Sequence, residues 1–255
     1  MGKSLDPFMH RVIATRAQAI QNSVERYHGT CTMRFSQCEP PLMTFITRDP
    51  ATSYGICEAL SACWIREHAA GRSLFTWLYT GFEKSGNAAR GVGMRVGRLA
   101  GVIQALQIEG SAAIDAADDA ASEEWLGAHE DPASRADSSR GAMRIPGLHA
   151  IGDTAAVGTP GGGVGSQALA SEICGTAGPD AGRYRKIGIE GMAGGHSMAA
   201  HIAGDVCLFD PNFGEFWFEN HDMFQSWFTG YFWHASMYSV GLSGSYRVHS
   251  YSGQA

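Results

Sequence analysis

The sequence predicts an α+β fold, with helices in the first half of the chain and an antiparallel sheet in the second. Apolar residues recur at three- and four-residue spacing after residue 56, as in Leu60, Cys63 and Trp64, which is typical of an amphipathic helix. Short, partly alternating runs follow residue 183 and predict strands. Helices that precede strands, rather than alternate with them, favour the α+β class.

Composition limits the kind of protein. The 255 residues are 44% hydrophobic, enough for one large domain with a core of its own. Charged residues make up only 17%, the net charge is −6, and no basic stripe is present, which argues against a nucleic-acid partner. No apolar run is long enough to span a membrane. Nothing in the sequence predicts a cofactor.

Two segments are expected, a lead-in over residues 1–50 and a domain over 51–255. A short helix is predicted over 11–27, and Glu39-Pro40-Pro41 interrupts any regular element after it. The helix that begins at Cys57 should end at Gly71.

The middle of the chain contains two stretches of different composition. Further helices are expected over 99–108 and 111–126, the second one exposed. Residues 127–182 collect Gly, Ser, Asp and Pro and predict an extended loop or insertion. Its glycines, Gly161 to Gly165, are not a phosphate-binding loop because no Lys-Ser/Thr pair follows them.

The last third of the chain predicts the sheet. Strands are expected at 187–190, 197–203, 206–209 and 215–218. Gly204 and Asp205 suit a hairpin turn between the second and third of these strands. The many aromatic residues between 216 and 238 are expected mostly in the core, and part of them could line a substrate groove.

Three residues form a candidate catalytic set. Cys57 stands where a helix begins, and a helix N-terminus stabilises a thiolate, the nucleophilic form of cysteine. His196 could activate the thiol as a base if the sheet packs against this helix. Asp210 follows across one predicted hairpin and could hold the imidazole in one tautomer; Asp205 is the competing residue, but it falls in the turn.

A tetrahedral intermediate also needs hydrogen-bond donors for its oxyanion. The backbone N–H of Cys57 is one candidate. Thr52 and Ser53 are the polar side chains just upstream, where no Asn or Gln is found.

The other cysteines and histidines have simpler interpretations. The six cysteines are expected to be mostly reduced, with Cys63, Cys174 and Cys207 in the core. His196 and His201 are five positions apart, which places them on opposite faces of a strand, so no metal site is predicted.

Three segments resemble the signatures of the YopT/AvrPphB family of papain-like cysteine proteases from bacterial virulence systems. They are Gly55-Ile56-Cys57-Glu58-Ala59-Leu60-Ser61-Ala62-Cys63-Trp64-Ile65, Gly195-His196-Ser197-Met198-Ala199 and Phe209-Asp210-Pro211-Asn212-Phe213-Gly214-Glu215-Phe216. The resemblance covers roughly residues 50–220 and implies a papain-like fold, in which a helical subdomain carries the Cys helix against an antiparallel sheet. It assigns Cys57 as nucleophile, His196 as base and Asp210 as the orienting residue.

The resemblance also implies a biological setting. It predicts a protease that a type III or similar secretion system delivers into a host cell, where it acts in the cytoplasm or at the membrane. Host substrates in the family include Rho-family GTPases and a protein kinase, and membrane association stays open. The 1–50 lead-in would suit a secretion signal or pro-segment. Two alternatives remain: a deamidase or acyltransferase with the same triad, and a non-catalytic host-protein binding module in which Cys57 is merely buried.

Overall fold

A nine-stranded sheet forms the centre of the molecule. The computed structural model describes residues 7–48, 56–97, 148–158, 163–175 and 183–253. The strands occur in the order β2-β3-β1-β8-β7-β6-β5-β9-β4, and neighbours are antiparallel except for the parallel pair β1 and β3. Their bounds are β1 Gly29–Arg34, β2 Tyr79–Ser85, β3 Ala88–Met94, β4 Leu148–Val157, β5 Tyr184–Gly191, β6 Gly194–Ile202, β7 Val206–Asp210, β8 Gly214–Phe218 and β9 Ser245–Gly253.

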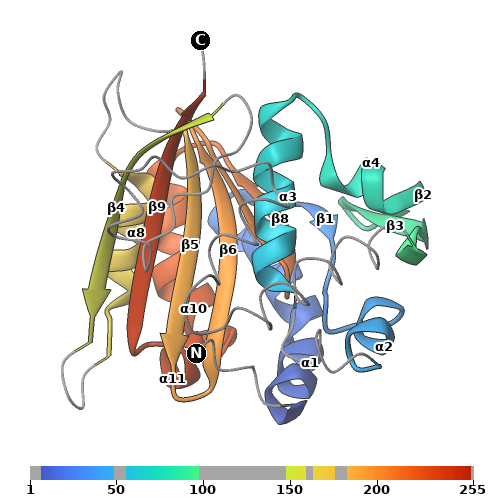
Figure 1. Ribbon diagram of the computed structural model, residues 1–255, viewed down its shortest axis with the longest axis horizontal. Helices are drawn as coiled ribbons and strands as arrows, with labels where there is room; N and C mark the ends of the chain where they lie inside the picture. The colour runs from blue at the N-terminus through green and yellow to red at the C-terminus, as the bar shows by residue number, and fades with distance from the viewer. Residues whose placement is uncertain (1–6, 49–55, 98–147, 159–162, 176–182, 254–255) are drawn as a thin grey trace, which may run out of the picture.

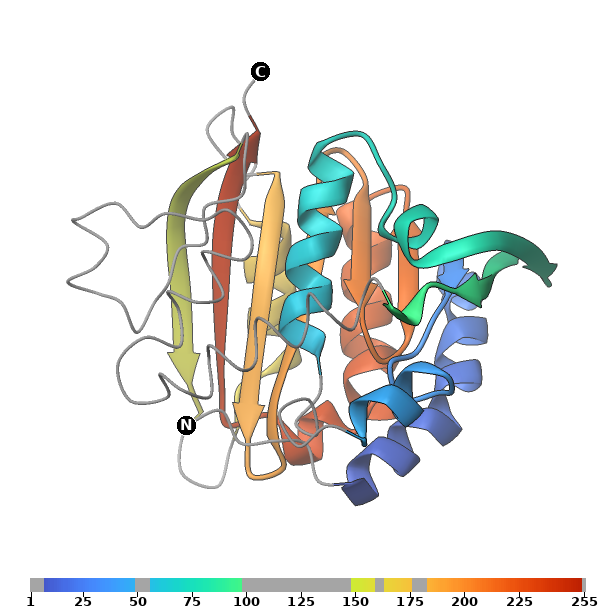
Figure 2. The same cartoon turned by 45° about the vertical axis from the view of Figure 1, so that its right-hand side comes forward.

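Helices cover both faces of this sheet. Helix α3 (Cys57–Ala69) crosses one face, as Figures 1 and 2 show, and packs mainly on β6. The short helices α2 (Leu42–Ile46) and α4 (Leu74–Leu78) share one hydrophobic cluster with α3. The opposite face is covered by the remaining helical elements: α1 Pro7–Ser23, η1 Val24–Tyr27, α8 Ser166–Cys174, α9 His221–Trp227, the π-helical turn η3 Phe228–Phe232, α10 Trp233–Ala235 and α11 Tyr238–Gly241.

Trp64 anchors α3 to the sheet. Its ring stacks on Phe209 of β7 with centroids 6.0 Å apart, and its indole Nε1 donates a 2.6 Å hydrogen bond to Glu215 Oε2 on β8. A large buried aromatic side chain contributes several kcal/mol when its packing is complete, on the order of 3–5 kcal/mol by truncation. The start of α3 is thereby held at a fixed place over the sheet.

The aromatic residues after 216 form the core on the other face, as expected. Phe218, Phe224, Trp227 and Phe232 are fully buried and pack against one another and against Phe216. Trp217 is the exception, because its position on β8 points it to the solvent side, where it is 36% exposed. Among the described helices, none is long and apolar enough to cross a membrane.

The expected α+β class is confirmed, as are the helix at Cys57, the helix over 11–27 and the four strands expected between residues 187 and 218; β9 was not expected. The segment expected as a lead-in contributes β1 to the sheet, where it pairs with β8. The Gly-rich stretch 127–182 contains two regular elements, β4 and α8, instead of loop alone. The helices expected at 99–108 and 111–126 lie outside the described residues.

A tight turn joins β7 to β8 and carries the Asp210-Pro211-Asn212 segment. Phe213 N donates a 3.0 Å hydrogen bond to Asp210 O, and Gly214 then adopts φ = +112°, a region that favours glycine. A Cβ at Gly214 would lie 2.3 Å from the carbonyl oxygen of Met33 on β1. The turn and the neighbouring strand therefore leave no room for a side chain.

Replacing Gly214 by Ala should lower the free energy of unfolding by about 1–3 kcal/mol, because both the positive φ and the contact with Met33 are unfavourable for alanine. Urea denaturation would measure the change. Gly204→Ala is the matched control, since a Cβ at Gly204 meets no atom within 4 Å. Equal stabilities for the two variants would contradict this account of the turn.

Candidate active site

Cys57 is the first residue of α3. The preceding residue, Ile56, is the N-cap and carries no capping side chain, while the Cys57 side chain is half-buried at the helix start. The positive end of the helix dipole and the unpaired N–H groups of the first turn therefore lie at this thiol. Such a position favours the thiolate over the thiol.

His196 and Asp210 are brought together by adjacent strands. His196 lies near the start of β6, and Asp210 is the last residue of β7, the strand that pairs with β6. His196 Nε2 is 3.0 Å from Asp210 Oδ1, and both side chains are 0% exposed. The ion pair is thus withdrawn from solvent, where its electrostatic interaction is strong.

The imidazole also forms a side-chain hydrogen bond with Cys57. Asp210 occupies Nε2, so the thiol interacts with the Nδ1 side of the ring, where Asn212 Nδ2 also lies 3.5 Å from Nδ1. Burial disfavours the charged imidazole, but the Asp210 carboxylate and the Cys57 thiol outweigh it and raise the pKa of His196 to about 10. The protonated ring is the stable form in the folded protein at neutral pH. Cys57, His196 and Asp210 therefore form one connected group.

Asp210 accepts hydrogen bonds from three donors. Oδ1 receives His196 Nε2 and, at 2.7 Å, the backbone N–H of Asn212. Oδ2 receives the phenolic hydroxyl of Tyr238 at 2.9 Å. Burial of a carboxyl group without hydrogen-bond donors is strongly unfavourable, so these three donors compensate the burial of Asp210.

Gln37 is a residue of the site that the sequence did not indicate. Its backbone N–H donates to Pro211 O at 2.7 Å, and its side-chain Nε2 donates to Asn212 Oδ1 at 2.8 Å. Its Oε1 accepts the backbone N–H of Ile56 at 3.2 Å. Gln37 is 0% exposed and joins the start of the Cys57 helix to the Asp210 turn. No local pattern marks it, because its role depends on two segments that are distant in sequence.

Glu58 and Lys186 form an ion pair beside Cys57. The pair joins the first turn of α3 to β5. Burial opposes ionisation of Glu58, but the neighbouring Lys186 charge lowers the pKa of the carboxyl below its ordinary value. Burial and the Lys186 charge lower the pKa of the nearby His249 to about 3, so that its imidazole is neutral at physiological pH.

Thr52 and Ser53, the predicted oxyanion residues, lie outside the described part of the chain. His196 and His201 face different surroundings: the ring of His196 is 5.2 Å from Tyr238, whereas the ring of His201 is 4.8 Å from His68 of α3. Among the described residues, no group of three or more His, Cys, Asp or Glu could hold a metal ion. The six cysteines are thiols and not disulfides; Cys63 and Cys174 are buried as expected, but Cys207 is only partly buried.

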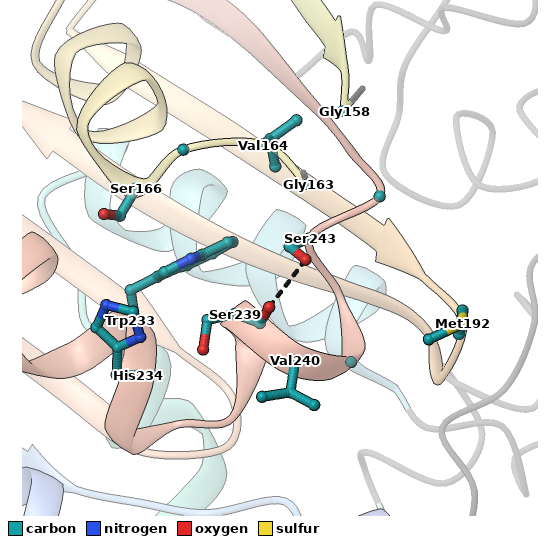
Figure 3. Close-up of a pocket in the computed structure, with 13 residues that line it drawn as sticks. Gly158, Gly163, Val164, Ser166, Met192, Trp233, His234, Ser239, Val240 and Ser243 are labelled. Atoms are coloured by element: carbon teal, nitrogen blue, oxygen red, sulfur yellow. Dashed lines mark hydrogen bonds between the residues drawn. The ribbon is translucent and has the colours of Figure 1, made fainter. Parts of the chain in front are cut away.

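A separate cavity of about 630 Å³ lies beyond the triad (Figure 3). Its walls come from the turn between β5 and β6, residues 163–166, and the outer side of α10 and α11. Trp233, Ser239 and Val240 line it, whereas Cys57, His196 and Asp210 do not. The cavity therefore does not include Cys57, His196 or Asp210.

Comparison with known proteins gives consistent matches over nearly the whole chain. The family model Peptidase_C58, described as Yersinia/Haemophilus virulence surface antigen, matches residues 21–252. The chain is 34% identical over 247 residues to the cysteine protease yopT1 of Yersinia enterocolitica, which covers 95% of this chain and 70% of that protein. It is 34% identical over 244 residues to the cysteine protease YopT of Yersinia pseudotuberculosis, covering 94% and 70%.

Two solved structures are also similar. The Pseudomonas avirulence protein AvrPphB matches with a TM-score of 0.46 and 16% identity, over 80% of this chain and 94% of that one. The YopT domain of the Pasteurella multocida PfhB2 toxin matches with a TM-score of 0.31 and 25% identity, over 87% and 94%. The family assignment rests on the sequence matches: the chain belongs to the Peptidase_C58 family of cysteine peptidases.

Proposed function

We propose that Cys57, His196 and Asp210 are the nucleophile, base and orienting residue of a cysteine protease that cleaves host proteins after delivery as a bacterial effector. The observation that carries the assignment is the buried imidazole of His196, which is hydrogen-bonded both to Asp210 and to the thiol at the start of α3. This is the arrangement that nucleophilic thiol catalysis requires: a nucleophile, a base in contact with it, and a group that orients the base.

In this mechanism the resting site already holds the proton on His196, and Cys57 attacks the carbonyl carbon of the scissile peptide bond as a thiolate. As the C–N bond breaks, the imidazolium gives its proton to the leaving amine, and an acyl-enzyme thioester remains. His196 is now a neutral base and takes a proton from a water molecule that attacks the thioester. The C–S bond breaks, the new carboxylic acid leaves, and the thiolate–imidazolium pair is restored. The backbone N–H of Cys57, with Thr52 and Ser53, is proposed to stabilise the oxyanion in both steps.

The host setting follows from the relatives. The two Yersinia relatives are cysteine proteases named YopT, and virulence appears in the description of the family. We infer that this protein acts inside a host cell, in the cytoplasm or at a membrane. Rho-family GTPases and protein kinases are the substrate classes to test first, because the family resemblance implies them.

Irreversible labelling with the thiol-protease inhibitor E-64 should modify Cys57 alone, and His196→Ala should slow the labelling at least 100-fold, because the thiolate loses its partner. Mass mapping of the modified peptide would measure both. Two variants serve as matched controls. Cys207→Ala removes the other partly buried thiol, and His201→Ala removes a histidine on the same strand. Equal labelling of His196→Ala and the parent would contradict the assignment.

A second expectation concerns stability against pH. The pKa of His196 is raised from 6.5 to about 10 by folding, so its contribution to stability is complete below pH 6.5 and is lost as the pH rises toward 10. Between pH 6.5 and 8.5 the parent should lose up to about 2 kcal/mol of unfolding free energy that His196→Gln does not lose.

This window avoids the buried thiols of Cys31, Cys38 and Cys63, whose pKa values near 12 affect stability only once the unfolded thiols ionise, above about pH 8.5. Denaturant titrations at several pH values would give the slope of unfolding free energy against pH for the parent and for His196→Gln. The matched variant His201→Gln should keep the slope of the parent. If the unfolding free energy of the parent varied with pH as little as that of His196→Gln, the imidazole would not be held in its charged form.

Incubation with a host-cell lysate should generate new protein N-termini that are absent when Cys57→Ala is used. N-terminal labelling and mass spectrometry would identify them and thereby the substrate. If Gln-to-Glu conversion or acyl transfer depended on Cys57 while no new N-terminus appeared, the deamidase or acyltransferase alternative would replace proteolysis.

A further inference from the structure

We propose that Tyr238 is a positioning residue of the active site: its hydroxyl holds the second oxygen of Asp210 and its ring covers the His196 imidazole. The inference rests on the proposed triad and extends it by one residue. Tyr238 lies 28 positions after Asp210, at the first position of α11, so no sequence motif links the two.

The first argument is that Tyr238 supplies a hydrogen bond to Asp210 Oδ2. The carboxylate is 0% exposed, and His196 and Asn212 N both bind Oδ1. Tyr238 Oη, at 2.9 Å, is the donor found for Oδ2 among the described residues. A bond at each oxygen prevents rotation of the carboxylate and therefore fixes the direction in which Oδ1 meets the imidazole.

The second argument is that the direction of the Tyr238 proton is set by its neighbours. Asn212 Oδ1 accepts hydrogen bonds from Gln37 Nε2 at 2.8 Å and from Cys38 Sγ at 3.4 Å, which identifies Nδ2 as the opposite end of this amide. Nδ2 donates to Tyr238 Oη at 3.0 Å, so the phenol must turn its own proton toward Asp210. The donors run in one direction, from Gln37 through Asn212 and Tyr238 to the carboxylate.

The third argument is the placement of the ring. Tyr238 is 0% exposed, and its ring centroid lies 5.2 Å from that of His196. Phe213, Phe232 and Trp233 surround the other sides of the phenol with centroids 5.8 to 6.2 Å away. Burial and the Asp210 charge raise the pKa of Tyr238 well above 10, so it remains a donor throughout the working pH range. The ring shields the Asp210–His196 hydrogen bond from water.

The backbone before Tyr238 is strained. Met237 adopts φ = +68°, one of two positive values recorded for non-glycine residues in the described chain. For a residue with a side chain, this conformation is unfavourable and persists where the surrounding structure requires it. Here it follows α10 and directs the next residue inward toward Asp210.

The test compares Tyr238→Phe, Tyr238→Leu and the parent by their E-64 labelling rates at Cys57. Tyr238→Phe keeps the ring and loses the hydroxyl, so its rate should fall roughly tenfold, as expected for one lost hydrogen bond to a charged group. The labelling rate of Tyr238→Leu should fall further, because this variant also loses the aromatic ring that covers the His196 imidazole. Tyr246→Phe is the matched control, since it removes the hydroxyl of another buried tyrosine, on β9, and should label like the parent.

A second readout separates positioning from general packing. In protein with ¹⁵N-labelled histidine, the Nε2–H of His196 should give a low-field, slowly exchanging proton signal that broadens or disappears in Tyr238→Phe and persists in Tyr246→Phe. If Tyr238→Phe keeps both this signal and the parent labelling rate, the positioning role is wrong. That result requires only Tyr238→Phe, even if Tyr238→Leu fails to fold. Failure of the parent itself to label at Cys57 would instead overturn the triad.

Discussion

The arrangement of this site depends on one buried negative charge, the carboxylate of Asp210. A carboxylate without exposure is costly unless every oxygen has donors, and the surrounding elements supply them. The turn at Gly214 brings the backbone N–H of Asn212 to Oδ1, β6 brings His196, and α11 brings Tyr238. Several otherwise unrelated features, including a positive φ at Met237 and a buried amide at Gln37, are explained by this single requirement.

The charge on Asp210 also raises the pKa of His196. It holds His196 protonated, and the protonated ring in turn offers a positive partner to sulfur at the positive end of α3. Both effects act in a region that excludes water, where they are stronger than at the surface. Trp64 and Gln37 keep the helix start in register with the turn, so the electrostatic effects act at a fixed distance.

The sequence predicted the parts of this structure that depend on local pattern. The helix at Cys57 follows from apolar spacing, and the meeting of His196 with Asp210 follows from a hairpin with a recognisable turn. Five strands were not predicted: β1, β2, β3, β4 and β9. The two at the edges of the sheet carry little apolar pattern, because β2 is mostly exposed and Ile151 and Val157 of β4 face solvent. An edge strand is stabilised by its single neighbour, which local sequence does not contain. Gln37 and Tyr238 were missed because their partners are non-local, and Thr52 and Ser53 remain predictions.

The dispersion of the site along the chain has a consequence for biosynthesis. Asp210 obtains its last donor from Tyr238, and the sheet that aligns β6 with β7 and β8 also contains β1 from near the start of the described chain. Contacts of such long sequence separation form late in folding. A ribosome-bound chain that has emerged only as far as Cys57 and the rest of α3 therefore has its thiol but not yet His196 or Asp210. The connected group of Cys57, His196 and Asp210 obtains all its hydrogen bonds only after synthesis has passed α11.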